Sequence, residues 1–145
     1  MVALVGVLVG IGFAVIPREG FALNQAAEGL ARDYQFARFE AIRRNEFVGL
    51  EVLPGSDSYR IFTDLNRNAV FDSGTDQTIK TVSLGDGGVS LSGTTAQLLV
   101  FDPRGLNPTT FAGERPMRLS TAGGRATYVC VNTNGRTRIS QGGCS

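Results

Sequence analysis

The residues of this 145-residue sequence best suited to binding a ligand lie near its end, in the run Gly135-Arg136-Thr137-Arg138. Asn134-Gly135 is a strong signal for a hairpin turn, so we expect the two arginines to open the last strand. Residues i and i+2 of a strand share a face, which predicts Arg136 and Arg138 side by side about 6.7 Å apart. Successive phosphates of a nucleic-acid strand have a similar spacing, so the pair is suited to bridging two phosphates.

The surroundings of this pair strengthen the interpretation. Residues 101–145 carry six arginines and two acidic residues, and Arg118 and Arg125 could extend the basic patch. We expect Thr137 and Ile139 to point the other way, toward the core. Any DNA binding would be led by phosphates and steeply salt-dependent, because no aromatic interleaving or base-reading helix is present. The alternative is an exposed hairpin whose arginines keep a strand edge soluble.

Cys130 and Cys144 are the two cysteines of the sequence. A bridge between them would close a 15-residue loop and contribute roughly 3 kcal/mol in the chain-entropy estimate. Two free buried thiols are the alternative. The spacing excludes a redox motif of the CxxC type.

A polar segment in the middle of the chain offers oxygen ligands at alternate positions, as calcium-binding loops do. The four residues that fit the first, third, fifth and ninth positions of an EF-hand loop are Asp64, Asn66, Asn68 and Asp72. Ala69 replaces the turn glycine, Thr75 stands where a bidentate Glu belongs, and Arg67 adds a positive charge. The alternative is a polar hairpin loop, since Asp and Asn favour turns on their own account.

Composition argues against an enzyme. The 14 basic and 13 acidic residues nearly balance, and histidine is absent from the sequence. This excludes His-dependent triads, zinc hydrolases and haem sites with a histidine ligand. The carboxylates are scattered, and no nucleophile–base arrangement is evident. We therefore predict no catalytic residue, no cofactor and no resident metal.

The N-terminal part of the sequence reads as helix. Residues 1–16 contain no charged or polar side chain; as a helix they reach about 24 Å, short of the roughly 30 Å hydrocarbon core of a membrane. Pro17 ends or kinks this segment, and residues 18–20 form a polar break. An amphipathic helix is expected from Asn24, as N-cap, to about Asn45. Its apolar face comprises Leu23, Ala27, Leu30, Tyr34, Ala37 and Ala41. Its opposite, solvated face comprises Glu28, Arg32, Asp33, Arg43 and Arg44.

After Asn45 the pattern becomes that of strands, with short runs rich in β-branched and aromatic residues between Gly-rich, Pro-Gly or Asn-Gly punctuation. The predicted strands are 47–53, 59–63, 78–84, 97–101, 117–120, 127–132 and 136–140. The fold class is thus α+β: a long N-terminal helix (1–45) packed on an antiparallel β-rich head (46–145).

This order of elements resembles that of a type IV pilin or pseudopilin. The helix text Ala26-Ala27-Glu28-Gly29-Leu30-Ala31, followed by residues 36–45 (FARFEAIRRN), is similar to the signature of minor pilins of the FimT/GspH type, as is the end of the chain, residues 129–139 (VCVNTNGRTRI). The family's prepilin mark, Gly followed by Phe with Glu four residues later, is not found. Cleavage by a prepilin peptidase and N-methylation are therefore assigned to no residue. If Met1 lies about six residues inside the mature N-terminus, the apolar segment reaches about 22 residues, long enough to span a membrane.

The resemblance implies a minor pilin that sits in the bacterial inner membrane and then enters a filament in the periplasm or at the cell surface, with other pilin subunits as partners. Its anchoring and assembly contacts would come from Val2, Leu4, Val7, Ile11, Phe13 and Pro17. In FimT-like pilins a C-terminal GRxR motif is associated with DNA binding during natural transformation. The resemblance therefore implies a double-stranded DNA site on Gly135, Arg136 and Arg138, to which we add Arg125. The alternative is a structural subunit that primes or caps a type IV pilus or a type II secretion pseudopilus and binds no DNA.

Overall fold

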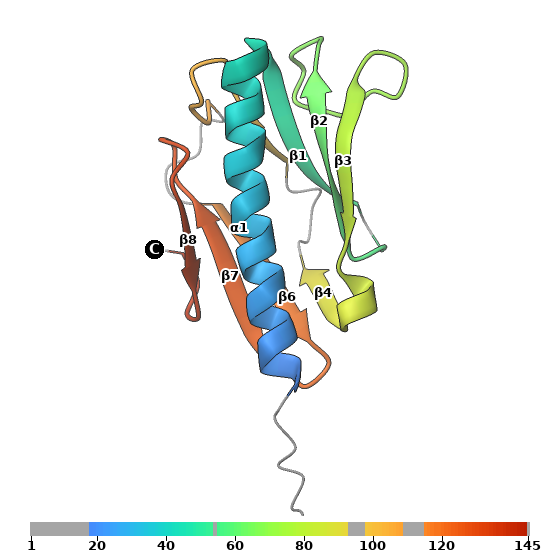
Figure 1. Cartoon of the computed structure of the whole chain (residues 1–145), viewed down its shortest axis with the longest axis vertical. Coiled ribbons are helices and arrows are strands. Elements are labelled where there is room, and N and C mark those ends of the chain that lie inside the picture. The colour runs from blue at the N-terminus through green and yellow to red at the C-terminus, as the bar shows by residue number, and fades with distance from the viewer. Residues whose placement is uncertain (1–17, 54, 93–97, 109–114, 145) are drawn as a thin grey trace, which may run out of the picture.

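The computed structural model describes residues 18–53, 55–92, 98–108 and 115–144. Within them a 27-residue helix, α1 (Arg18–Arg44), lies across two four-stranded antiparallel sheets (Figure 1). The first sheet has the order β3 (Gln77–Ser83), β2 (Ser58–Asp64), β1 (Phe47–Leu53) and β5 (Leu98–Phe101). The second has the order β4 (Val89–Ser92), β6 (Arg115–Thr121), β7 (Ala126–Val131) and β8 (Thr137–Ser140). A short 3-10 turn, η1 (Gly85–Gly87), precedes β4. The α+β class is confirmed.

Helix α1 begins earlier than its sequence predicts. Arg18, Glu19 and Gly20 are helical rather than a polar break, and Asn24 lies inside the helix instead of capping it. Arg and Glu are good helix formers, and a single glycine costs only about 1 kcal/mol, which the packing of the following turns offsets. The helix ends close to the predicted place. Asn45 adopts a left-handed conformation (φ 55°), and the Glu46 amide donates to the Ala41 carbonyl at 3.2 Å.

The predicted membrane and assembly residues lie outside the described part of the chain. These residues are Val2, Leu4, Val7, Ile11, Phe13 and Pro17. In the part that is described, α1 is neither apolar enough nor free enough of charge to qualify as a membrane span.

The predicted apolar face of α1 is buried along its whole length, from Leu23 to Ala41. It covers alternating side chains of both sheets, so a single core lies between the helix and the strands. In the first sheet Leu50 of β1 pairs with Ile61 of β2, and in the second Met117 of β6 pairs with Val129 of β7; all four are buried. The helix therefore fixes the positions of the two sheets relative to each other.

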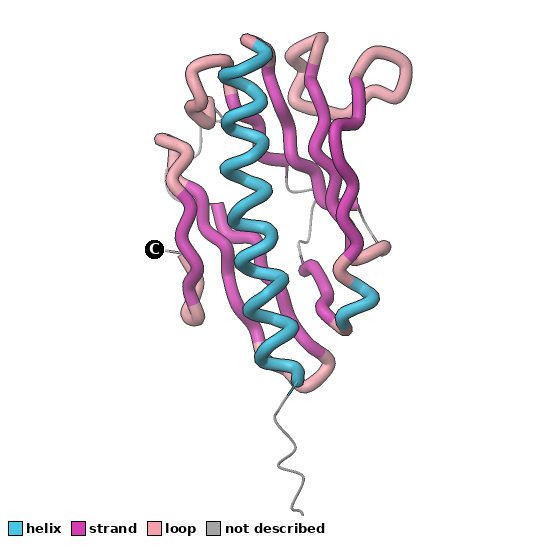
Figure 2. The backbone as a smooth tube through the Cα atoms, viewed as in Figure 1, coloured by secondary structure: helices cyan, strands magenta, loops and turns pink. Residues whose placement is uncertain are grey.

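All seven predicted strands are present, within one to two residues at each end, and β4 is an eighth that the sequence pattern missed. It has only four residues, alternating Val and Leu with Ser, directly after a Gly-rich turn. The tube view shows how β4 leaves the end of β3 to join the second sheet (Figure 2). The chain then returns to the first sheet for β5 and crosses to the second sheet again for β6.

Asp33, predicted on the solvated face of α1, is instead buried, with 8% of its surface exposed. Its carboxylate accepts a hydrogen bond from the Tyr59 hydroxyl at 2.7 Å and pairs with Lys80 Nζ at 2.6 Å. The polar partners offset the cost of burying a carboxylate. Burial, together with the hydrogen bond to Asp33, raises the pKa of Tyr59. This cluster connects the helix to strands β2 and β3.

Candidate nucleic-acid interface

The β7–β8 turn, which carries the predicted arginine pair, is closed by three hydrogen bonds around Asn132. The Gly135 amide donates to the Asn132 carbonyl at 2.9 Å, and the Asn132 amide donates to the Arg136 carbonyl at 3.1 Å. The Asn132 side-chain oxygen also accepts from the Arg136 amide at 2.9 Å. Gly135 has a φ of 73°, a left-handed conformation that favours glycine. The turn expected from Asn134-Gly135 is therefore present, and β8 begins one residue after Arg136.

Helix α1 holds this turn from its inner side. Gln35 Nε2 donates to Thr137 Oγ1 at 2.6 Å and to the Gly135 carbonyl at 3.3 Å. Thr137 thus faces the helix, as predicted, and the side chains on either side of it alternate to the outer face. Arg136 and Arg138 are both exposed.

Ile139 does not reach the core as predicted, since 42% of its surface is exposed. It pairs with Val129 of β7, which is fully buried. β8 is the edge strand of its sheet, however, so no further strand covers Ile139 from the open side.

A second loop braces the same turn. Residues 102–107 follow β5, and within them the Asn107 amide donates to the Thr133 carbonyl at 3.1 Å. Asp102 shapes this loop by accepting from the Leu106 amide and by pairing with Arg104 at 2.7 Å. Burial opposes ionisation of Asp102, but the hydrogen bonds from Leu106 and Arg104 outweigh it and lower its pKa.

Arg38 is the residue that the sequence reasoning missed as part of this site. Its half-buried side chain leaves α1 and lies against both Gly105 and Gly135. Its Nε lies 3.0 Å and 3.1 Å from the points where a Cβ on these glycines would sit. That Nε is buried and has no hydrogen-bond partner in the described part of the chain. A positive charge is thus held directly behind the turn. The sequence feature that could have pointed to Arg38 is its position in residues 36–45, which resemble the family signature.

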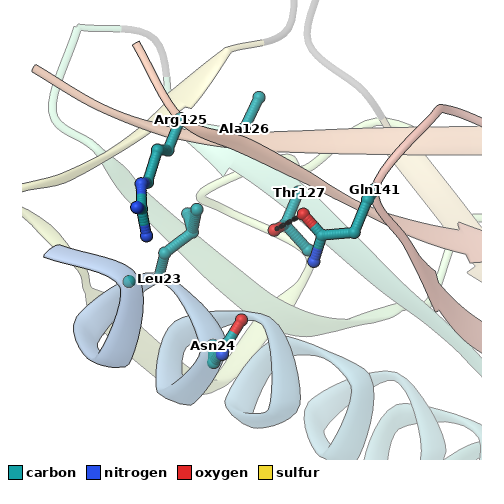
Figure 3. A pocket seen from close by; sticks show the side chains of 7 residues that line it. Leu23, Asn24, Arg125, Ala126, Thr127 and Gln141 are labelled. Carbon is teal, nitrogen blue, oxygen red and sulfur yellow. Dashed lines mark hydrogen bonds between the residues drawn. The ribbon is translucent and has the colours of Figure 1, made fainter. Parts of the chain in front are cut away.

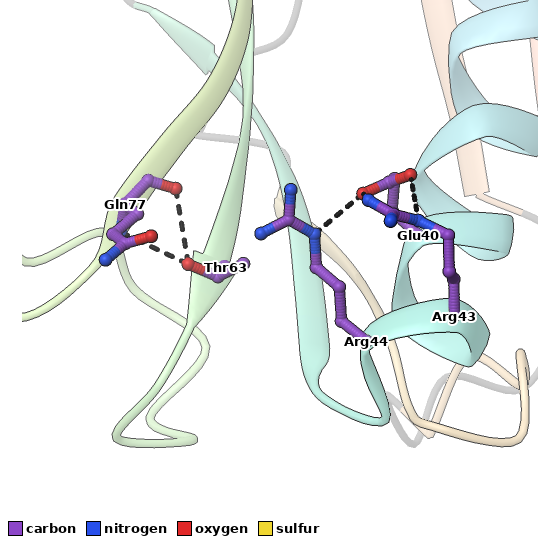
Figure 4. A network of polar contacts seen from close by, with 5 residues as sticks. All are labelled: Glu40, Arg43, Arg44, Thr63 and Gln77. Atoms are coloured by element: carbon purple, nitrogen blue, oxygen red, sulfur yellow. Dashed lines mark hydrogen bonds and ion pairs between the residues drawn. The ribbon is translucent and has the colours of Figure 1, made fainter.

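The other arginines near the end of α1 are used differently. Arg43 and Arg44 both pair with Glu40 at 2.7 Å (Figure 4). Hydrogen bonds to the Glu40 carboxylate lower its pKa to about 2, and the bond from Arg43 contributes more than the bond from Arg44. The charge of these two arginines is therefore partly neutralised within the protein, whereas Arg38 forms no ion pair with any residue that the structure describes.

Arg118 and Arg125, which could extend the patch, lie in different places. Arg118 is on the outer face of β6, opposite Tyr128, and so shares a face with Arg138 two strands away. Arg125 lies in the β6–β7 turn, at the other end of β7 from Arg136. The six residues of β7 separate them by roughly 20 Å. The structure does not bring Arg125 to the arginine pair.

The two cysteines form a disulfide bond, with a Cα–Cα distance of 5.7 Å. Cys130 stands directly opposite Arg138 in the pairing of β7 with β8. The bridge ties the tail after β8 back to β7 and so fixes the strand that carries Arg138.

The four predicted calcium ligands are hydrogen-bonded within their own loop. The carboxylate of Asp64 accepts from the amides of Asn68 and Ala69, and that of Asp72 accepts from the side chains of Asn66 and Asn68. Among the described residues no three acidic, His or Cys side chains are grouped to hold a metal ion. These hydrogen bonds are those of a polar loop that is stabilised by its own side chains.

Comparisons with known proteins agree on one family. The family described as "Type II transport protein GspH" matches residues 26–137. The pilin-like protein PilA1 of Thermus thermophilus is 34% identical over 147 residues, covering 96% of this chain and 91% of its own.

Two solved structures share the fold. The type IV minor pilin FimU of Pseudomonas aeruginosa superposes with a TM-score of 0.65 at 18% identity, over 83% of this chain and 90% of its own. The minor pseudopilin EpsH of the Vibrio cholerae type 2 secretion system superposes with a TM-score of 0.61 at 14% identity, over 83% and 97%.

Proposed function

The chain belongs to the GspH family of type IV minor pilins and pseudopilins, and from this premise we propose that it is a FimT-like minor pilin that binds double-stranded DNA for uptake in natural transformation. Members of the family are structural subunits that assemble with other pilins. In our proposal the apolar N-terminal segment anchors the subunit in the inner membrane and then packs in the core of the filament. The head carries the DNA contact to the surface.

The observation that supports DNA binding most is the mounting of Arg136 and Arg138. Both are exposed, on the outer side of a turn that Gln35, Arg38 and the 102–107 loop hold from behind. A rigid mounting lowers the entropy cost of placing two guanidinium groups against phosphates. The charge of Arg38, which forms no ion pair within the described residues, raises the positive potential at the same place. Two or three arginines give weak, sequence-independent binding per subunit, which a filament of many subunits would multiply.

The alternative is a purely structural minor pilin or pseudopilin. The position of β8 favours it, because an edge strand needs charged side chains to prevent pairing with other chains, and Arg138 meets that need. The two functions differ in whether the isolated subunit binds DNA.

DNA binding by the full chain in a non-ionic detergent separates them. Fluorescence anisotropy of a labelled duplex is measured across a salt series for the wild type, for Arg136→Ala/Arg138→Ala, and for Arg32→Ala/Arg67→Ala. The last variant removes the same charge from α1, on the side of Lys80, and from the β2–β3 loop. We expect the first variant to bind more weakly and to lose about 2 from the slope of log Kd against log salt, with the control close to wild type. A wild type that binds no DNA at low salt, or equal losses in both variants, would leave the structural function.

A further inference from the structure

A second place suited to an anion lies at the opposite end of the head. A groove with a volume of about 390 Å³ lies between the first turns of α1 and the β6–β7 turn. Gln141, which follows β8, also lines it. Figure 3 shows Arg125 extending toward the helix, with the Asn24 side chain pointing into the groove from below. The groove thus combines one cation with amide groups that can donate hydrogen bonds.

Arg125 has no partner of its own in the described part of the chain, in ion pairs or in hydrogen bonds of its side chain. Its Nη1 lies 2.7 Å from the point where a Cβ on Gly20 would sit, so the guanidinium group lies against the helix at a position that has no side chain. The nearby carboxylate of Glu19 lies against Gly123, on the other side of the same turn, and forms no ion pair with Arg125. A guanidinium group without a protein partner, beside amide donors, is chemically suited to a phosphate.

The level of the groove indicates the source of that phosphate. The apolar run of the sequence ends at Ile16, and Gly20 lies four residues further on. Four residues of an α-helix rise about 6 Å. The headgroup layer on each side of a bilayer is about 5–7 Å thick. Arg125, in contact with the helix at Gly20, would therefore lie at the level of lipid phosphates when residues 1–16 are in the membrane. Phe21, 65% exposed, adds an apolar ring at the same level.

We infer that the Arg125 groove binds the phosphate of a phospholipid headgroup and so holds the head against the membrane surface before the subunit enters a filament. Arg125 supplies the charge, Asn24 and Gln141 supply hydrogen bonds, and Gly20 provides the space. The inference rests on the membrane anchoring in the proposed function, and it is independent of DNA binding. Assembly into a filament would break this contact, because the subunit then leaves the bilayer.

The test uses the full chain in detergent with added lipid, with native mass spectrometry to count the lipids that remain bound. We expect wild type to retain one phosphatidylglycerol, Arg125→Gln to retain at least five-fold less, and Arg32→Gln, whose side chain does not line the groove, to match wild type. Gly20→Ala keeps the charge and favours the helix, yet it displaces the guanidinium group and should also reduce retention. A phosphate-free galactolipid should not be retained by any of the four proteins.

Three outcomes would overturn the inference. The first is equal lipid retention by wild type and Arg125→Gln. The second is full displacement of phosphatidylglycerol by millimolar inorganic phosphate, which would make the site one for free phosphate. The third is an Arg125→Gln variant that retains lipid as wild type does but forms fewer chemical crosslinks to neighbouring subunits. This result would make the partner of Arg125 an acidic group of a neighbouring pilin. If Arg125→Gln binds DNA as tightly as wild type does, the lipid site and the DNA site are separate. Failure of one proposal then leaves the other standing.

Discussion

Gly135 and Gly105 approach so closely that a Cβ on residue 135 would lie 2.8 Å from the Gly105 carbonyl oxygen. Both glycines have a positive φ, 73° and 75°. The contact joins the turn before Arg136 to the loop that follows β5, although 30 residues separate them in the sequence. The glycine of the GRxR motif is therefore needed for packing as well as for the turn.

Gly135→Ala should destabilise the head by about 1–3 kcal/mol, because alanine meets both an unfavourable backbone conformation and the Gly105 carbonyl. Urea denaturation of the full chain in detergent measures this loss. Gly142→Ala is the matched control, since a Cβ there has open space around it. Equal stability of the two variants would contradict the role given to Gly135.

Stability should fall in acid through Glu40. Its pKa is about 2 in the folded protein, against an ordinary value of 4.5, because Arg43 and Arg44 bind the carboxylate. A lowered pKa contributes stability that is fully present above the unfolded value and is lost as the pH falls from about 4.5 to about 2. The urea midpoint of the wild type should therefore fall over this range, and that of Glu40→Gln should fall less steeply. Parallel profiles for the two proteins would contradict this assignment. Asp102 titrates in the same direction, so some slope remains in the variant.

The Asp33 cluster yields a ranking of three variants. Asp33→Ala leaves the buried Tyr59 hydroxyl without its acceptor and should cost about 1–3 kcal/mol. Lys80→Met removes an ion pair whose lysine is 45% exposed and should cost about 0–1 kcal/mol. Asp33→Ala/Tyr59→Phe should recover part of the loss, because no hydroxyl is then left unpaired. Chemical denaturation gives all three values, and a Lys80→Met variant as unstable as Asp33→Ala would show that the ion pair dominates instead.

Removal of the disulfide by Cys130→Ser/Cys144→Ser should lower the free energy of unfolding by roughly 3 kcal/mol, because the unfolded chain regains the entropy of a 15-residue loop. Wild type measured with and without a reducing agent provides an independent estimate. If reduction leaves the denaturation midpoint unchanged, the bridge does not stabilise the strand that carries Arg138.

The sequence predicted those features that depend on local periodicity. The apolar face of α1 repeats every three to four residues, and seven strands have clear turn signals on either side. β4 was missed because four residues with alternating serines carry little signal. The polar break at residues 18–20 was wrong because contacts with the head outweigh one weak helix former.

The candidate site was predictable only in part, for a different reason. The pair Arg136 and Arg138 follows from a turn signal and the strand period. Arg38 and Gly105 reach the same turn from segments about 100 and 30 residues away, so no local pattern could place them there. The burial of Asp33 likewise depends on Tyr59 and Lys80, which come from other strands.

The role in DNA uptake is tested most directly in cells whose own gene for this minor pilin is replaced by one that encodes the full chain or its variant. The measurement is uptake of labelled duplex DNA by Arg136→Ala/Arg138→Ala cells, with the number of surface filaments counted in the same cells. Our account predicts a loss of uptake of ten-fold or more with filaments as abundant as in wild type. Unchanged uptake in cells with normal filaments would contradict it.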